Sequence, residues 1–394
     1  MMLVFVGKLK EILPIDLIKN FRKSLQKLVL DSYRKSFNFK VVGRGEDDYI
    51  PEHHHLMEFG QEEIVEINEP VTIGQVHDSF KRQMGTFTIP QPFVCEVKQA
   101  RLVGSLAIGF DQQGNLLSDT VIPNFSKSEN IVPVRTLLRK NAHAKSTVEV
   151  ASSLVNVWGN NYYHWVADCL TRLQGVEHYQ TETGIRPKLI INTKPTKWQV
   201  ESLRLLGYTE KDCIPWSPNL IVENLIIPSF PRVSFAHFSP SAFHWLRQRV
   251  LESIQSQDCT SPEFSPRVLI SRRKATGRKI LNEEEVLALL TPLGFIPYCL
   301  EDLSFTDQVR LFSRAEIVVA PHGAGIVNTL FSKQLNLVEL FSVPINPLMF
   351  ILAKSLGFHY SYLLCRSFQR KFNYRRVNMA VNTDELQALL EKIL

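Results

Sequence analysis

The hydrophobic pattern is clearest in the last third of the chain, where a continuous apolar segment is followed by a polar turn. Residues 317–320 are Ile-Val-Val-Ala, a pattern typical of a strand buried on both faces of a parallel sheet. The sequence Pro-His-Gly-Ala-Gly at 321–325 interrupts it, and apolar residues then recur at helical spacing over 326–331. A second apolar strand follows at 337–341. This order predicts a βαβ unit with a glycine-bearing turn after its first strand.

That turn has the features of an anion site. Gly323 and Gly325 would let a ligand approach the backbone, and the start of the helix offers unpaired N–H groups to a phosphate. Glycines at such turns are often required only by the backbone conformation, so the prediction of a ligand site depends on the residues around the turn. His322 stands beside it, and Glu339 follows at roughly the 20-residue distance of an acidic residue that binds ribose hydroxyls. We therefore expect a nucleotide-like ligand.

The rest of the chain divides into three parts by its pattern. Residues 1–40 predict an amphipathic helix with a basic face, which would lie on an anionic membrane surface, dock on its own domain or bind a partner helix. Residues 41–240 predict a first α/β domain, with a β hairpin turning at 111–115 and a doubly wound part after it. Residues 241–394 predict a second α/β domain. The fold class is therefore α/β.

The helix predicted near residue 162 carries an imidazole and a carboxylate on one face. Asn161 can cap this helix, and His164 and Asp168 are four residues apart. Such a pair can act as an oriented general base or ligate a metal, although pairs at this spacing are also common as surface or capping features.

A basic loop follows the strand predicted at 267–270. Residues 271–279 contain five cations, among them Arg272, Arg273 and Arg278. Arg side chains bind phosphate oxygens in bidentate fashion. Basic loops are frequent on protein surfaces, but at the carboxyl end of a parallel strand this one favours an anion pocket.

Composition narrows the function classes. The net charge of +6 suits an anionic ligand or membrane surface and gives no reason to expect nucleic acid. The six cysteines are scattered singly, which argues against a zinc site and a disulfide framework and favours a reducing compartment. No apolar run reaches roughly 18 residues, so no transmembrane helix is predicted. The His53–His55 run is expected to be a solvated loop.

Three motifs now stand in order: NYYHWVADCLTRL at 161–173, ISRRKATGRKILNEEEV at 270–286, and PHGAGIVNTLF at 321–331 with VELF after it. Together they resemble glycosyltransferase family 61, over about residues 100–365. The resemblance implies a GT-B-like fold of two Rossmann-like doubly wound domains facing a cleft, with the nucleotide sugar mainly on the second. It also implies an inverting reaction without a bound metal ion. One departure is the loop at 332–336, which lacks the Pro-Gly turn common after Leu-Phe.

The resemblance assigns roles to the motif residues. The arginines would hold the diphosphate, the third motif would line the nucleotide site with Asn328 supporting it, and Glu339 would reach the ribose. His164 and Asp168 would face the sugar or acceptor, with His164 the first choice of base. The implied donor-binding residues are Arg272, Arg273, Arg278, His322, Gly323, Ala324, Gly325, Asn328 and Glu339.

The expected function is that of an inverting, metal-independent glycosyltransferase. It would move a sugar from a nucleotide-diphosphate sugar to a hydroxyl of a glycan or lipid-linked acceptor in surface polysaccharide biosynthesis, such as that of a capsule. No cofactor is expected beyond this donor. The expected location is the cytoplasm, peripheral at the inner face of the membrane through residues 1–40.

Two alternatives stay open at this point. The first is a non-catalytic protein that binds a nucleotide sugar or polysaccharide in an assembly complex. The second is another phosphate-ester enzyme that uses the same anion loop. That enzyme would need a nucleophile or metal ligands that the sequence does not display.

Overall fold

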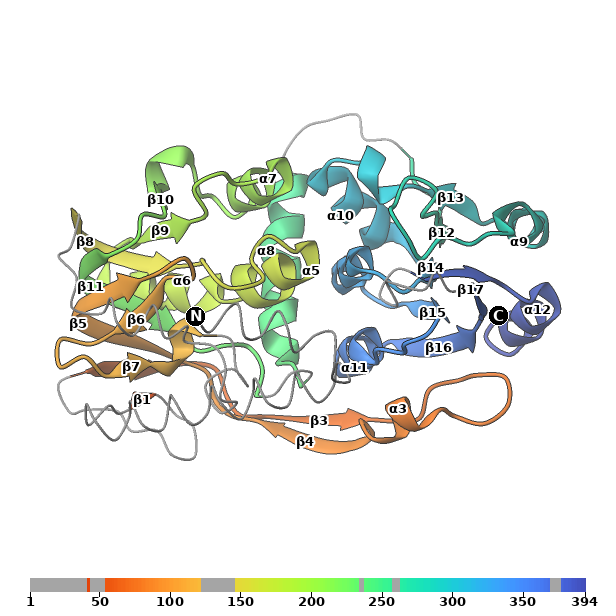
Figure 1. The fold of residues 1–394 in the computed structure, drawn as a ribbon, viewed down its shortest axis with the longest axis horizontal. Helices are drawn as coiled ribbons and strands as arrows, with labels where there is room; N and C mark the ends of the chain where they lie inside the picture. The colour runs from red at the N-terminus through yellow and green to blue at the C-terminus, as the bar shows by residue number, and fades with distance from the viewer. Residues whose placement is uncertain (1–40, 43–53, 122–145, 234–236, 257–262, 369–376) are drawn as a thin grey trace, which may run out of the picture.

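The computed structural model describes residues 41–42, 54–121, 146–233, 237–256, 263–368 and 377–394 (Figure 1). The amphipathic helix expected in residues 1–40 lies outside the described residues. Two sheets organise the described part, a large mixed sheet and a smaller parallel one. No helix in these ranges has the length and apolarity that crossing a membrane requires.

The large sheet has nine strands in the order β1-β7-β6-β5-β11-β8-β9-β10, with β2 paired to β5. Its strands are β1 (Val41–Val42), β2 (His55–Glu58), β5 (Phe93–Val103), β6 (Ile108–Phe110), β7 (Leu116–Leu117), β8 (Ser146–Ser153), β9 (Lys188–Ile191), β10 (Cys213–Pro215) and β11 (Leu220–Pro228). Strands β11, β8, β9 and β10 run parallel to one another, whereas β2, β5 and β6 join neighbours antiparallel.

The expectation of a doubly wound first domain therefore needs correction, because half of this sheet is antiparallel. Short connections can join only antiparallel strands. The predicted hairpin is confirmed: Asp111 and Asn115 close the turn between β6 and β7, with the Asn115 backbone N–H donating to Asp111 Oδ1 at 2.7 Å. The parallel part alone matches the predicted alternation of helix and strand.

The first half contributes the helices α5 (Tyr162–His164), the π-helical turn η2 (Trp165–Leu170), α6 (Leu173–Thr183), α7 (Lys197–Leu205) and α8 (Pro240–Gln255), with short 3₁₀ turns η1 (Ser118–Thr120) and η3 (Glu210–Asp212). Among these helices, α6 packs on the large sheet, whereas α5, α7 and α8 contact helices of the second half. In α8, Ser239 caps the first turn by accepting from the Ala242 N–H, and Pro240 fits the first helical position.

The small sheet is fully parallel, in the order β13-β12-β14-β15-β16. Its strands are β12 (Arg267–Ile270), β13 (Ile296–Tyr298), β14 (Ile317–Pro321), β15 (Asn336–Phe341) and β16 (His359–Leu364). Counted along the chain this is the order 2-1-3-4-5, one of the two common doubly wound orders. The order reverses between β12 and β14, and open α/β sheets bind ligands at the carboxyl end of that switch point.

Helices cover both faces of this sheet, as the doubly wound prediction requires. Val318 and Ala320 of β14 pack towards one face, and Ile317 and Val319 pack towards the other. The elements are α9 (Glu283–Leu290), η4 (Thr291–Leu293), η5 (Leu300–Asp302), α10 (Phe305–Arg314), η6 (Ala324–Phe331), α11 (Leu348–Ser355) and α12 (Thr383–Glu391), with the hairpin strands β17 (Arg366–Phe368) and β18 (Asn378–Ala380). The predicted βαβ unit is confirmed as β14-η6-β15, although η6 is a 3₁₀ helix.

An early segment crosses to the small sheet. The hairpin of β3 (Glu63–Ile67) and β4 (Gly85–Ile89), with α3 (Asp78–Lys81) in its loop, runs along α11 and β16 (Figure 1). Val71 forms a bridge with Ser361 of β16, and Phe80 is buried and stacks on Tyr362. The division at residue 240 stays a prediction. The small sheet nevertheless packs against the β3–β4 hairpin, which comes from the first half of the chain.

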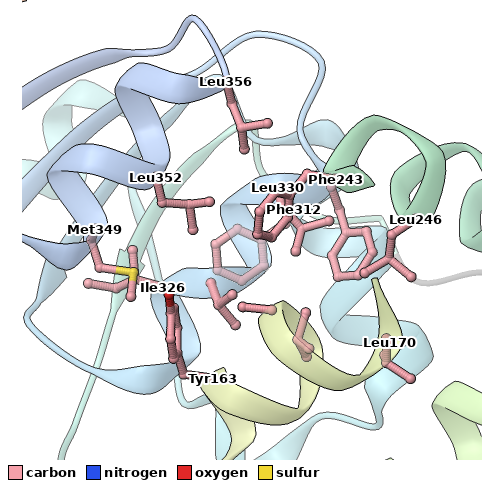
Figure 2. Close-up of a cluster of buried hydrophobic side chains, with 14 of the residues drawn as sticks. Tyr163, Leu170, Phe243, Leu246, Phe312, Ile326, Leu330, Met349, Leu352 and Leu356 are labelled. Atoms are coloured by element: carbon pink, nitrogen blue, oxygen red, sulfur yellow. The ribbon is translucent and has the colours of Figure 1, made fainter. Parts of the chain in front are cut away.

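A single apolar core joins the two halves. The helix α5–η2 and α8 pack from one side against α10, η6 and α11 from the other (Figure 2). The labelled members are Tyr163, Leu170, Phe243, Leu246, Phe312, Ile326, Leu330, Met349, Leu352 and Leu356. This core fixes the helix of the first motif against the helix of the third.

Candidate active site

The first motif begins with the predicted cap. Asn161 Oδ1 accepts hydrogen bonds from the backbone N–H groups of Tyr163 at 3.0 Å and His164 at 3.5 Å. The helix then widens into the π-helical turn η2, a feature that often marks functional sites. The cap and the turn together place His164 and Asp168 on one side of the helix.

His164 is anchored through one ring nitrogen. Its Nδ1 lies 2.7 Å from Asp168 Oδ2, and its ring stacks on Trp158 with centroids 4.6 Å apart. The Asp168 side chain is fully buried, whereas 14% of the His164 side chain is exposed. The arrangement leaves Nε2 of His164 for a substrate, so His164 fits the role of base better than Asp168.

A buried arginine completes this group, and the sequence analysis missed it. Arg232 Nε lies 3.0 Å from Asp168 Oδ1, and its Nη2 donates to Asp168 Oδ2 at 3.2 Å. The residue stands in a segment rich in Pro and Phe, where a lone Arg is an unusual side chain. A buried guanidinium needs a buried anion as its partner. A lone Arg in an apolar segment was therefore the sequence signal that pointed to such a pair.

The third motif contains a second histidine–carboxylate pair. His322 Nδ1 lies 2.5 Å from Glu339 Oε1, and the Tyr360 hydroxyl donates to Glu339 Oε2 at 2.6 Å. The His322 ring stacks on Phe341, and 16% of its side chain is exposed. The pair comes from adjacent strands, with His322 following β14 and Glu339 lying inside β15.

Glu339, for which the resemblance implies a ribose contact, makes its hydrogen bonds inside the protein. The side chain of Glu339 is fully buried, and both of its oxygens are engaged by His322 and Tyr360. A carboxylate in a buried strand is costly unless it is paired, and these partners satisfy it. Glu339 thus contacts His322 in this structure, and the ribose contact stays a prediction.

The basic loop and the glycine turn meet at the switch point. A Cβ on Gly323 would lie 2.5 Å from Arg272 Nη1, so the guanidinium lies directly against this glycine. Gly323 has an extended backbone, with φ of −177°, so the close approach and not its dihedral angle accounts for the glycine. Arg272 Nε donates to the Gly277 carbonyl at 3.2 Å, and burial lowers the pKa of Arg272.

The other two arginines lie differently. Arg273 is half exposed and turns to Glu283, with Nη2 3.4 Å from Oε1. Arg278 has a left-handed backbone with φ of 57°, which non-glycine residues rarely adopt. Of the three arginines, Arg272 is the one whose guanidinium the structure shows against the glycine turn.

The remaining predicted residues lie in η6. Ala324 and Gly325 form its start, and a Cβ on Gly325 would lie 2.5 Å from Leu300 Cδ1, so this glycine serves packing. Asn328 is fully buried; its amide donates to Gln308 Oε1 at 2.7 Å, and its Oδ1 accepts from the Tyr162 hydroxyl at 2.7 Å. Asn328 thus ties the turn to the helix of the first motif.

The structure therefore brings all three motifs to one place. Tyr162 and Asn328 join the first motif to the third, and Arg272 and Gly323 join the second to the third. Among the described residues, no group of three or more His, Cys, Asp or Glu side chains is arranged to hold a metal ion. These contacts connect the helix that carries His164 to the turn that carries His322, and they place Arg272 against the same turn.

Comparison with known proteins finds a family match for the part of the chain that contains the three motifs. The family model described as glycosyltransferase 61 matches residues 162–336. Protein O-linked-mannose beta-1,4-N-acetylglucosaminyltransferase 2 of Xenopus laevis is 45% identical over 84 residues, and that of Homo sapiens is 41% identical over 78 residues. The EGF domain-specific O-linked N-acetylglucosamine transferase of Gallus gallus is 28% identical over 136 residues.

These matches cover parts of each protein. They span 20%, 19% and 33% of this chain, and 14%, 13% and 25% of the Xenopus, human and chicken proteins, respectively. The region of the family match begins at the helix of His164 and ends at the start of β15. Residues 162–336, which carry all three motifs in whole or in large part, therefore match glycosyltransferase family 61.

Proposed function

We propose that the protein is a glycosyltransferase that moves a sugar from a nucleotide-diphosphate sugar to an acceptor hydroxyl, with inversion and without a bound metal ion. The observation that carries this proposal is His164, which is anchored at Nδ1 by buried Asp168 on a helix that packs against the third motif. The two sheets would be the two lobes of a GT-B arrangement, with the donor on the small sheet.

The reaction follows from these positions. Nε2 of His164 takes the proton of the acceptor hydroxyl as its oxygen attacks the anomeric carbon from the side opposite the diphosphate. The bond between that carbon and the phosphate oxygen breaks, and the diphosphate departs with the electron pair. Arg272 and the N–H groups at the start of η6 stabilise the charge that it gains. A single displacement of this kind inverts the anomeric configuration.

The names of the relatives support N-acetylglucosamine as the transferred sugar. The acceptor we propose is a hydroxyl of a glycan, in surface polysaccharide assembly or on a lipid-linked precursor. The relatives are named for protein-linked acceptors, so glycoproteins belong in the same acceptor screen.

We also propose that the enzyme works in the cytoplasm, at the inner face of the membrane, held there by the basic face of residues 1–40. Sedimentation with anionic vesicles tests this. A chain lacking residues 1–40 should stay in the supernatant while the full chain sediments. Equal sedimentation of both would contradict the proposal.

The experiment for the main proposal is a calorimetric screen of nucleoside diphosphates and nucleotide sugars, followed by turnover with the donor that binds. His164→Gln should lower kcat by about 10²–10⁴-fold, because it removes the base, while the affinity for the nucleotide stays near that of the wild type. Arg272→Gln should weaken nucleotide binding. EDTA should leave turnover unchanged.

Each alternative outcome has a clear meaning. Near-normal turnover by His164→Gln would refute its role as base, and loss of turnover in EDTA would refute the metal-free reaction. Nucleotide binding without turnover on any glycan would instead support the non-catalytic binding protein. No binding of any nucleotide would refute the assignment of the donor site.

A further inference from the structure

The two histidines of the site are built alike. In each, Nδ1 faces a fully buried carboxylate, the ring stacks on an aromatic side chain, and about one seventh of the side chain is exposed: 14% for His164 and 16% for His322. The difference lies behind the carboxylates. Arg232 stands behind Asp168, whereas Tyr360 stands behind Glu339.

Behind His164, the buried charge is already compensated. Arg232 contacts both oxygens of Asp168, so the carboxylate has a cationic partner whether or not His164 carries a proton on Nε2. A buried ion pair needs only one cation for each anion. Asp168 therefore does not need a charged His164 to balance it, and this suits a general base.

Behind His322, the partner of the carboxylate is a phenol. Burial and the nearby Glu339 carboxylate raise the pKa of Tyr360 well above its ordinary value, so its hydroxyl donates a hydrogen bond and brings no charge. Within the described ranges, the ion pair that Glu339 makes is the one with His322. An ionised carboxylate with no exposed surface is costly without a cation beside it.

Arg272, the other charged side chain at this turn, does not pair with Glu339. The Arg272 guanidinium lies against Gly323, donates to Gly277 and is attracted by Glu301. Glu339 is in direct contact with the His322 ring, whereas Arg272 contacts Gly323 and Gly277.

We propose that His322 is held as an imidazolium that donates its Nε2–H to the departing diphosphate, and so complements the neutral base His164. The charge assignment stands on the contacts of Glu339 alone, while the diphosphate as its ligand rests on the proposed function. His322 follows β14 at the switch point, beside Gly323 and Arg272, where an anion would bind. A cation aimed at the leaving group stabilises the charge that develops there.

The test of the charge is NMR of the full chain with ¹⁵N-labelled histidine at about neutral pH. His164→Gln and His322→Gln identify the two sets of ring signals. We expect two protonated nitrogens for His322 and a single Nδ1 proton for His164. A neutral His322 ring in the free protein would overturn the proposal.

The test of the role uses inorganic pyrophosphate and uridine diphosphate in calorimetry. Glu339→Gln should remove the second ring proton from His322 and weaken both ligands about tenfold, equivalent to about 1.4 kcal/mol. Glu316→Gln is the matched control: Glu316 is exposed just before β14, at the opposite end of the same strand. It should change neither the ring signals nor the affinities.

The two proposals fail in different ways. If His322 is an imidazolium but neither ligand binds the wild type, the proposed donor site is wrong and the charge assignment remains. If both ligands bind and Glu339→Gln binds them as tightly as the wild type, the role of His322 in holding the diphosphate is refuted while the donor site survives.

Discussion

The hydroxyl of Tyr162 donates a 2.7 Å hydrogen bond to Oδ1 of Asn328, across 166 residues of sequence. Tyr162 stands two residues before the candidate base His164, and Asn328 stands three residues after Gly325 of the glycine turn. The amide of Asn328 donates in turn to Gln308 of α10. This bond therefore links the helix that carries the base to the turn that would hold the donor.

Removing the Tyr162 hydroxyl should destabilise the protein. Burial raises the pKa of Tyr162, so the group is a phenol that donates, and Tyr162→Phe leaves the Asn328 oxygen buried without this donor. An unsatisfied buried acceptor costs about 1–3 kcal/mol. Urea unfolding should show a loss of that size. Tyr179→Phe is the control, since the Tyr179 hydroxyl bonds at 3.2 Å to the partly exposed Glu96, and an equal loss there would count against the argument.

A carboxylate of the first half caps a helix of the second. Glu201 of α7 accepts from the backbone N–H groups of Phe305 at 2.9 Å and Thr306 at 3.0 Å, at the start of α10. A negative charge at a helix N-terminus is favourable, and loss of a capping oxygen costs about 0.5–2 kcal/mol. Glu201→Ala should lower the free energy of unfolding by that amount, with a smaller effect at high salt. Glu223→Ala, at an exposed position of β11, should stay within about 0.5 kcal/mol of the wild type; equal losses would contradict the cap.

Local patterns predicted the parts of the site that lie close together in sequence. Three features depend only on residues close together in the sequence: the cap at Asn161, the shared face of His164 and Asp168, and the βαβ unit. The periodicity of the sequence shows such short spacings directly. The glycine turn belongs to the same class. These features follow from the backbone geometry of single elements.

The contacts between residues far apart in the chain could not be predicted from the sequence. Arg232 reaches Asp168 from a segment rich in Pro and Phe, and Tyr360 reaches Glu339 from a neighbouring strand. Each depends on which elements become neighbours, and apolar periodicity does not specify that. Glu339 illustrates this limit: a charged residue in a strand is equally compatible with a ligand contact and with a buried partner, and only the packing of β16 places Tyr360 beside it.

A methyl group on Gly323 should weaken anion binding with little effect on folding. The backbone of Gly323 is extended and accepts any residue, but the new Cβ would lie 2.5 Å from Arg272 Nη1 and push the guanidinium aside. We expect Gly323→Ala to bind uridine diphosphate about tenfold more weakly in calorimetry. If Arg272 carries the effect, Gly323→Ala should cost little further affinity in an Arg272→Gln background. Full additivity of the two substitutions would contradict this.

The ion pair of Asp168 and Arg232 allows structure and chemistry to be separated. Asp168→Asn leaves the Arg232 guanidinium buried without its anion, and breaking a buried pair costs about 3–5 kcal/mol. Replacing both partners by neutral groups, as in Asp168→Asn with Arg232→Met, removes the uncompensated charge and should regain most of that stability in urea unfolding.

Turnover should not return with stability. His164 would still lack the carboxylate that orients its ring, so the double variant should remain at least about tenfold slower than the wild type, with its affinity for uridine diphosphate preserved. His164→Gln should show the converse, a slow enzyme of nearly normal stability, because its ring is partly exposed and Asp168 keeps Arg232. A double variant that regains both stability and turnover would show that Asp168 serves the fold and not the base.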